Sequence, residues 1–261
     1  MAPLCRPIKD VDRTNKPCLK LRVVRRFYRT GAGRDNRSLE IVFHDSEGGR
    51  ITGIVKQLNL KFFDNRFTQG RVYSIKGYYV ENNIGKFLTT LAKFRIVIHA
   101  KTWLIEMPQE CFFPDYMFDF RNFGTLVDVD KVDETLLFDV IGKVTVIHNP
   151  QEKEFSGRRA RLIEIVLQDL SGRQISCTLW GDYVDEILAF EGNLKAGPPI
   201  LILQLCRAKV YRETGVARYI WSLLPNTLSY GWRFRLIRLD EFSTSIKKMD
   251  SSIVGGGFFV V

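Results

Sequence analysis

A segment of this chain occurs twice, and the spacing between the two copies constrains the fold more than any other feature. Residues 40–51 read EIVFHDSEGGRI and residues 164–175 read EIVLQDLSGRQI, at an offset of 124 positions. Each copy contains an apolar strand, a D-x-x-G turn and a second strand, which is the pattern of a β-hairpin. Because the offset is close to the length of a typical domain, we infer two copies of one domain rather than a short solenoid repeat.

The two turns carry the same chemistry. Asp45 and Asp169 are in register, and we expect each carboxylate to accept a hydrogen bond from its own backbone two residues further on. Gly48 and Gly172 are also in register, and we expect both to have the positive φ that such turns need.

The order of the predicted elements is the same in both halves. In the first half, strands are expected at 19–28, 39–44 and 50–56, a short helix over 58–67, and strands at 72–80 and from 86 to about 99. In the second half, strands are expected at 136–147, 161–168 and 173–180, a helix over 182–190, and strands at 200–210 and about 217–223. This order predicts a mainly β chain of two tandem OB-folds, which are five-stranded Greek-key barrels with a short helix between strands three and four.

The predicted domain limits follow from this order. Residues 1–107 form the first OB-fold, residues 131–225 the second, and residues 226–261 a C-terminal tail that is partly helical or disordered. The linker over 108–130 is rich in aromatic residues and contains Pro114, whereas flexible linkers are rich in Gly and Ser. We therefore expect the linker to pack against a domain.

Charge is distributed unevenly between the two halves. The chain has a net charge of +10; residues 1–112 hold 21 Lys and Arg against 10 Asp and Glu, and residues 113–261 hold 18 against 19. Such asymmetry indicates a polyanionic partner for the first half, although many soluble proteins are basic without binding nucleic acid.

Several function classes find no support in the sequence. The five cysteines include no C-x-x-C pair and His44, His99 and His148 are far apart, so no metal is expected. No stretch is apolar enough to span a membrane, and the N-terminus lacks the apolar run of a secretory signal. The cysteines are scattered and odd in number and indicate no disulfide framework, so a reducing, intracellular compartment is expected. Phosphate-binding and nucleophile motifs are also missing, so we expect neither an enzyme nor a cofactor.

The second copy carries residues that resemble a known family. Cys177-Thr178-Leu179-Trp180-Gly181-Asp182, just after the repeated turn, resembles the third strand of the second DNA-binding domain in the large subunit of replication protein A. Asp139-Val140-Ile141-Gly142 and the linker sequence FPDYMFDF resemble plant and transposon-associated members. The resemblance covers about residues 20–225 and implies that two aromatics per domain stack on the bases of single-stranded DNA, while basic side chains contact phosphates.

The resemblance implies a set of DNA-binding residues. Trp180 lies where the family has its third-strand stacking aromatic, and its alternative role is that of a core tryptophan. In the first domain the same position is taken by Ile54 or Val55, which implies weaker binding by that domain. The other implied aromatics are Phe87, Tyr211, Phe27 and Tyr28, and the implied phosphate ligands are Arg25, Arg26, Arg34, Arg37, Arg158, Arg159 and Arg161. A solvated basic surface is the alternative for the arginines, and Glu152 and Glu154 could neutralise the last three.

The function implied is single-stranded DNA binding in replication, repair or recombination, in the nucleus. The alternatives are binding of RNA or of a telomeric single strand, and a protein-interaction module that has lost its affinity for nucleic acid. The family's trimerisation domain is not recognised in this sequence, so we expect no assembly with the other two subunits of such a trimer.

Overall fold

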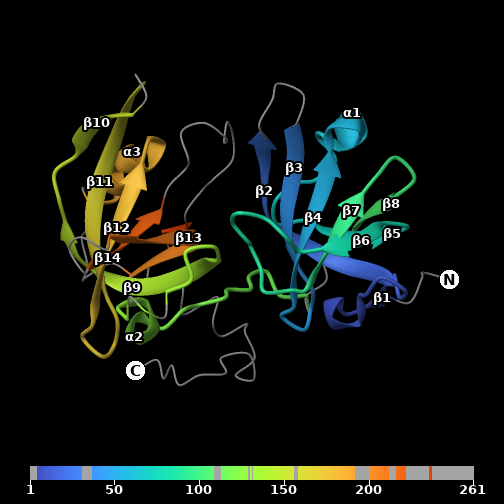
Figure 1. The fold of residues 1–261 in the computed structure, drawn as a ribbon, viewed down its shortest axis with the longest axis horizontal. Helices are drawn as coiled ribbons and strands as arrows, with labels where there is room; N and C mark the ends of the chain where they lie inside the picture. Colours follow the sequence, from blue (N-terminus) through green and yellow to red (C-terminus); the bar gives the residue numbers. More distant parts are fainter. Residues whose placement is uncertain are drawn as a thin grey trace.

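The chain folds into two curled β-sheets that lie side by side (Figure 1). The computed structural model describes residues 5–30, 37–108, 113–128, 130, 132–155, 158–191, 200–211, 216–221 and 235–236. One sheet has the strand order β6-β7-β4-β3-β2-β5-β8 with β1 on β2, and the other has β10-β11-β12-β14-β13-β15 with β9 between β11 and β13. The prediction of a mainly β chain with two tandem OB-folds is confirmed.

The first barrel closes through the pairing of its first and fourth strands. β2 pairs with β3 and with β5, β4 pairs in parallel with β7, and β6 pairs with β7. Strand four of the OB-fold is split into β5 and β6 around Gly77, which has a φ of 73°. Its elements are β1 (Cys5–Arg6), η1 (Ile8–Asp10), β2 (Cys18–Thr30), β3 (Arg37–His44), β4 (Arg50–Lys56), η2 (Gln57–Asn59), α1 (Leu60–Phe63), β5 (Val72–Lys76), β6 (Tyr79–Asn82), β7 (Phe94–Ile98) and β8 (Trp103–Met107).

The second barrel has the same connections. β9 pairs with β11 and β13, and β12 pairs in parallel with β14, as β4 does with β7. Its elements are β9 (Leu137–Ile147), β10 (Gln151–Phe155), β11 (Arg158–Gln168), β12 (Gln174–Trp180), α3 (Asp182–Glu191), β13 (Ile200–Tyr211), β14 (Val216–Trp221) and β15 (Arg235–Leu236).

The repeated turns have the predicted hydrogen bonds. Asp45 Oδ1 accepts from the amides of Glu47 and Gly49 at 3.0 and 2.8 Å. Asp169 Oδ1 accepts from the amides of Ser171 and Arg173, both at 2.9 Å. Gly48 and Gly172 have φ values of 91° and 78°, so both predictions about the turns are confirmed.

Each barrel has its own core, built from the inward positions of alternating strands. Ile163, Ile165 and Leu167 of β11 are fully buried in the second core. Leu39, Ile41 and Phe43 of β3 take the corresponding positions in the first core. Because side chains alternate between the faces of a strand, the neighbours of these residues lie on the outer face, where a ligand can be met.

Strand five of the first domain differs from the prediction. Residues 83–93 form a loop, and the strand consists of β7 and β8 on either side of a turn at 99–102. The Asn83 side chain donates to the carbonyls of Thr90 and Ala92 at 3.1 and 2.9 Å, and the Leu88 amide donates to the Thr135 carbonyl at 2.7 Å. These hydrogen bonds satisfy polar groups of the loop without a strand neighbour.

The linker packs against the first barrel, as expected. The buried Arg22 guanidinium donates to the carbonyls of Phe113 and Gly70 and pairs with Asp115 at 3.1 Å. α2 (Phe123–Leu126) begins at Asn122, whose side chain accepts from the Gly124 amide at 2.6 Å. The domain limits themselves stay predictions, and the tail beyond residue 225 lies outside the described residues except for β15. No helix in the described part of the chain is long and apolar enough to cross a membrane.

Candidate nucleic-acid interface

Trp180 lies at the end of β12 on the outer face of the second barrel. Leu179, the preceding residue, is fully buried in the core, so the tryptophan side chain points away from it. Trp180 is half-buried and pairs in register with Leu162 of β11, which is buried beside it. A flat ring held at the edge of an outer strand face can stack on a base.

The residue equivalent to Trp180 in the first barrel is Lys56, not Ile54 or Val55. Trp180 pairs with Leu162, and Lys56 pairs with Ser38, each at the repeat offset of 124. Val55 takes the place of Leu179 and is fully buried in the core. The two hairpins align without a gap. Applying the repeat offset of 124 to Trp180 therefore identifies Lys56 as its equivalent from the sequence alone.

The arginines near Trp180 lie opposite acidic residues. Arg161 pairs across the strands with Glu152, and Arg159 with Glu154. The Arg161 guanidinium also lies 2.9 Å from the Asp185 carboxylate of α3. Arg159 and Arg161 are exposed, and Arg158 begins β11 but its side chain lies outside the described residues. This end of β11 therefore carries both basic and acidic side chains.

The corresponding outer face of the first barrel is covered. Val42 of β3 packs with Phe27, Leu137 and Leu205, and Phe87 of the loop at 83–93 packs against this cluster. Thr89, also from the loop, lies 2.7 Å from Thr52 through the hydroxyl oxygens. Since Leu137 and Leu205 belong to the second barrel, the loop and the second domain together cover β3 and β4.

Predicted site residues are part of this junction. Phe27 is buried, and Phe87 is half-buried with the Arg207 guanidinium 4.2 Å from its ring centroid. Arg25 is buried and lies near Tyr183 of α3. Burial raises the pKa of the Tyr183 phenol, and the positive charge of Arg25 counteracts part of that rise. The roles of Phe27, Phe87 and Arg25 in DNA binding stay predictions.

Arg26 and Tyr28 alternate with Arg25 and Phe27 along β2 and lie on the opposite face of that strand. Tyr28 is buried, its hydroxyl donates to Asp64, and the exposed Arg37 guanidinium lies 3.9 Å from its ring centroid. Arg26 donates to the carbonyls of Asp64 and Phe67 at 2.8 and 2.9 Å. Arg34 and the side chain of Tyr211 lie outside the described residues.

A buried carboxylate lies under the covered face. Glu40 is 5% exposed on β3, and burial raises the pKa of its carboxyl, while Arg29 at 3.0 Å and Arg95 counteract that rise. An acidic group here disfavours a phosphate at the same place. Glu40 is part of the repeat and aligns with Glu164, so its position, though not its burial, was readable from the sequence.

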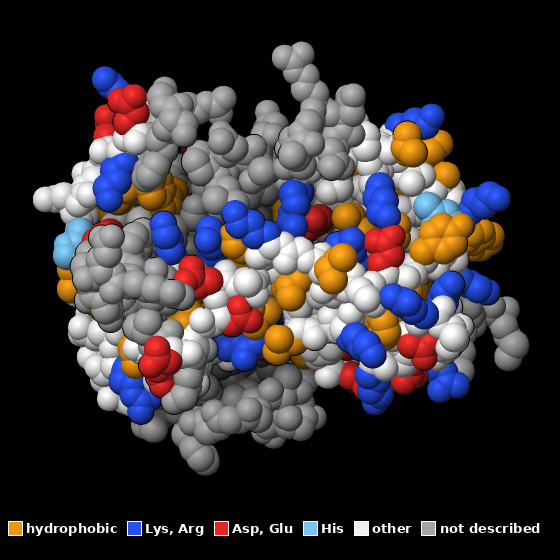
Figure 2. Space-filling view, viewed as in Figure 1, with side chains coloured by type: hydrophobic (Ala, Val, Ile, Leu, Met, Phe, Trp, Pro, Cys, Tyr) orange, Lys and Arg blue, Asp and Glu red, His pale blue; other side chains and the backbone are white. Residues whose placement is uncertain are grey.

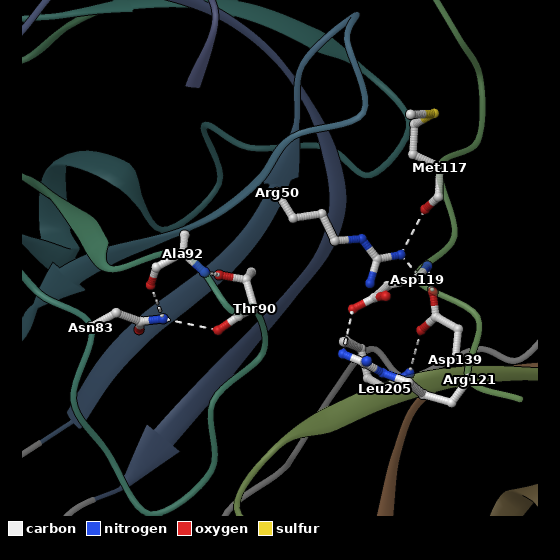
Figure 3. A network of polar contacts seen from close by, with 9 residues as sticks. All are labelled: Arg50, Asn83, Thr90, Ala92, Met117, Asp119, Arg121, Asp139 and Leu205. Atoms are coloured by element: carbon white, nitrogen blue, oxygen red, sulfur yellow. Dashed lines mark hydrogen bonds and ion pairs between the residues drawn. The ribbon is translucent and has the colours of Figure 1, made fainter. Parts of the chain in front are cut away.

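The junction contains a buried interdomain ion pair, which the sequence patterns did not predict (Figure 3). Arg50 Nη2 lies 2.5 Å from Asp139 Oδ2 and also donates to the Met117 carbonyl at 2.6 Å. Asp139 accepts as well from the amides of Asp119 and Leu205, both at 2.9 Å. In the repeat Arg50 aligns with the uncharged Gln174. This difference in charge was the one sequence feature that singled out Arg50.

The Asp139 carboxylate also stabilises an unusual backbone conformation. Leu205 has a φ of 56°, which is rare for a residue other than Gly, and it lies where the register of β13 shifts against β9. Among the described residues, no group of three or more His, Cys, Asp or Glu side chains could hold a metal ion.

A family model and a curated protein match parts of this chain. A family model described as "Domain of unknown function DUF223" matches residues 13–128. A 70 kDa DNA-binding polypeptide of replication protein A from Oryza sativa subsp. japonica is 28% identical over 145 residues, which is 54% of this chain but 15% of the rice protein. The chain thus spans a small part of that relative's length.

Solved structures that match this chain share little sequence identity with it. A replication protein A heterotrimer bound to ssDNA gives a TM-score of 0.49 at 19% identity, over 78% of this chain and 47% of that one. Fission yeast Pot1 with ssDNA gives 0.32 at 8% identity, over 95% and 94% of the two chains. A murine DNA-binding protein bound to double-stranded DNA gives 0.40 at 10% identity, over 85% and 95%.

Proposed function

We propose that this protein binds single-stranded DNA, with Trp180 on the outer face of β12 as a base-stacking side chain. The observation that carries the proposal is the position of Trp180, half-buried and turned away from Leu179 at the edge of an otherwise regular barrel. Stacking on an aromatic ring tolerates any base and contributes about 1–3 kcal/mol per base.

The charge of the chain supports the same proposal. Its net charge is +10, and Figure 2 shows Lys and Arg side chains in a row across the middle of one face, over both domains. Phosphate contacts by such side chains release counterions, so the affinity should fall steeply with salt. The resemblance to replication protein A supports roles in replication, repair or recombination and a nuclear location, and those finer roles are part of the proposal.

The two domains do not contribute equally in this proposal. The first barrel has Lys56 where the second has Trp180, and its β3–β4 face is covered by residues 83–93 and by the second domain. We therefore assign the main stacking contact to the second domain. Because the covered face is not available to a ligand, the test must also distinguish an interaction module that has lost its affinity for nucleic acid.

The test is fluorescence-anisotropy titration of the full chain with an oligothymidine of about 8–16 nucleotides, the range of OB-fold site sizes, at two salt concentrations. Trp180→Ala should weaken binding by about 1–3 kcal/mol, and Trp180→Phe should retain most of the affinity. Leu170→Ala is the matched control, since Leu170 is an exposed apolar residue at the opposite end of β12, in the turn before it.

The possible outcomes separate the alternatives. Salt-sensitive binding that depends on Trp180 supports the proposal, and a parallel titration with oligouridine distinguishes DNA from RNA preference. Absence of binding at low salt would refute it and favour the interaction module.

A further inference from the structure

The first barrel carries an exposed pair of aromatic rings whose residues are not among the predicted site residues. Tyr79 of β6 is 57% exposed, and its ring is stacked on His99 with centroids 4.3 Å apart and an interplanar angle of 15°. Trp103, which begins β8 after the turn at 99–102, is 70% exposed. Single exposed apolar side chains are common, but a group of them on one surface is typical of a binding site.

The pair lies on the same outer face as the position that corresponds to Trp180. Tyr79 pairs with Val97 of β7, and Val97 pairs with Ile54 of β4. Ile54 lies two residues before Lys56, so both point to the outer face. The Lys56 ammonium lies 2.6 Å from Glu81, two residues after Tyr79 on β6. The aromatic pair is therefore close to the place where the first barrel lacks its tryptophan.

Three exposed lysines lie next to these aromatic residues. Lys16 Nζ lies 5.9 Å from the Tyr79 ring centroid, the Lys101 amide donates to His99 Nδ1 at 3.3 Å, and Lys76 pairs with Trp103 across the strands. Within the described part of the chain, none of these three lysines has an acidic partner. In Figure 2 hydrophobic side chains gather beside a histidine and several basic side chains at the right-hand end of the molecule.

We propose that Tyr79, His99 and Trp103 form a second stacking platform for single-stranded nucleic acid, with Lys16, Lys76 and Lys101 as phosphate contacts. The inference rests on the proposed function and adds a site outside the covered β3–β4 face. Flat rings interleaved with unpaired cations suit a single strand, whose bases stack and whose phosphates are anionic. A protein partner fits less well, because lysine is depleted from the centres of protein interfaces.

The test compares two lengths of labelled oligothymidine on the full chain. One of about 10 nucleotides occupies a single OB-fold, and one of about 30 nucleotides can reach both domains. Tyr79→Ala should weaken binding of the long oligonucleotide roughly tenfold, because the loss of one stacked base is of that size, and should leave the short one nearly unchanged. Tyr79→Phe keeps the ring and should bind as the wild type does.

The controls distinguish this inference from the proposed function. Trp180→Ala should weaken binding of both lengths, whereas Tyr79→Ala and Lys101→Glu should affect only the long one. Photo-crosslinking of a long oligonucleotide carrying 5-iododeoxyuridine should label the segment that contains Tyr79 or Trp103. Equal affinity of Tyr79→Ala and wild type for the long oligonucleotide would overturn the platform while leaving the role of Trp180 intact. A wild-type protein that binds neither length would overturn both.

Discussion

Replacement of Asp139 by alanine tests whether the two barrels are held together by one buried carboxylate. Asp139 is fully buried, Arg50 has a side chain that is 7% exposed, and the two lie 2.5 Å apart. The substitution leaves the Arg50 cation without its carboxylate, which costs about 3–5 kcal/mol for a buried pair. It also removes the acceptor for the amides of Asp119 and Leu205, and a buried unsatisfied donor costs about 1–3 kcal/mol.

A loss of at least about 4 kcal/mol follows for Asp139→Ala. For a chain of this size, 1 kcal/mol shifts Tm by about 2–4 °C, so Tm should fall by roughly 8–16 °C. Thermal unfolding followed by calorimetry measures the change and shows whether the two domains then unfold separately. Asp185→Ala is the matched control, since its ion pair with Arg161 is largely exposed and should contribute about 0–1 kcal/mol.

A double-mutant cycle separates the ion pair from the backbone contacts. Arg50→Met removes the cation but keeps an apolar side chain of similar length, and Asp139→Asn keeps an acceptor oxygen. Because the partners touch, the cycle should give a coupling energy of about 0.5–3 kcal/mol, and additive effects would mean that they do not interact. A Tm for Asp139→Ala that matches Asp185→Ala would refute the buried interdomain pair.

Two further predictions concern the first barrel. Burial lowers the pKa of His44 to about 4, below its ordinary value of 6.5, so the unfolded chain binds a proton more readily and stability should fall by about 3 kcal/mol as pH drops from 6.5 towards 4. Urea titrations at several pH values across this range measure the free energy of unfolding. Its decrease on acidification should be smaller for His44→Phe than for the wild type, and an equal decrease would contradict the assignment to His44. Gly53→Ala places a Cβ 2.6 Å from Phe43 Cε2, so it should destabilise the domain by about 1–3 kcal/mol through overpacking. Phe43→Leu in the Gly53→Ala background should recover part of this loss in the same assay, and a neutral Gly53→Ala would show that the ring moves freely.

The fold could be predicted because the repeat combines local turn chemistry with a strand pattern. The D-x-x-G turns fix where each hairpin reverses, and the alternation of apolar residues fixes which face is inside. β4 was predicted over its full extent for this reason, since Gly48 and the core positions leave no other register. β10 was missed because four of its five residues, 151–154, are polar and give no strand pattern, and the strand is visible only through its pairing with β11.

The loop at 83–93 shows why local patterns fail at the junction. Most of its apolar residues come as the adjacent pairs Phe87-Leu88 and Leu91-Ala92 and do not alternate as in a strand. Leu88 pairs with Leu136 from the second domain, and Phe87 packs on the interdomain cluster. Contacts between domains have no local sequence period, so apolar content alone cannot distinguish a strand from a loop that packs on a neighbour. The burial of Phe27 and Arg25 has the same origin.

The covered face also changes how the two copies should be compared. Val55 and Leu179 are both inward and apolar, whereas the outward residues Lys56 and Trp180 at the same offset differ. The outward residues Val42 and Val166 are identical, but Val42 is fully buried in a cluster that includes Leu137 and Leu205 of the second domain, and Val166 is half-buried. An isolated first domain would expose this apolar surface. Its ligand affinity alone would therefore not report its contribution in the intact chain, and both domains must be measured together.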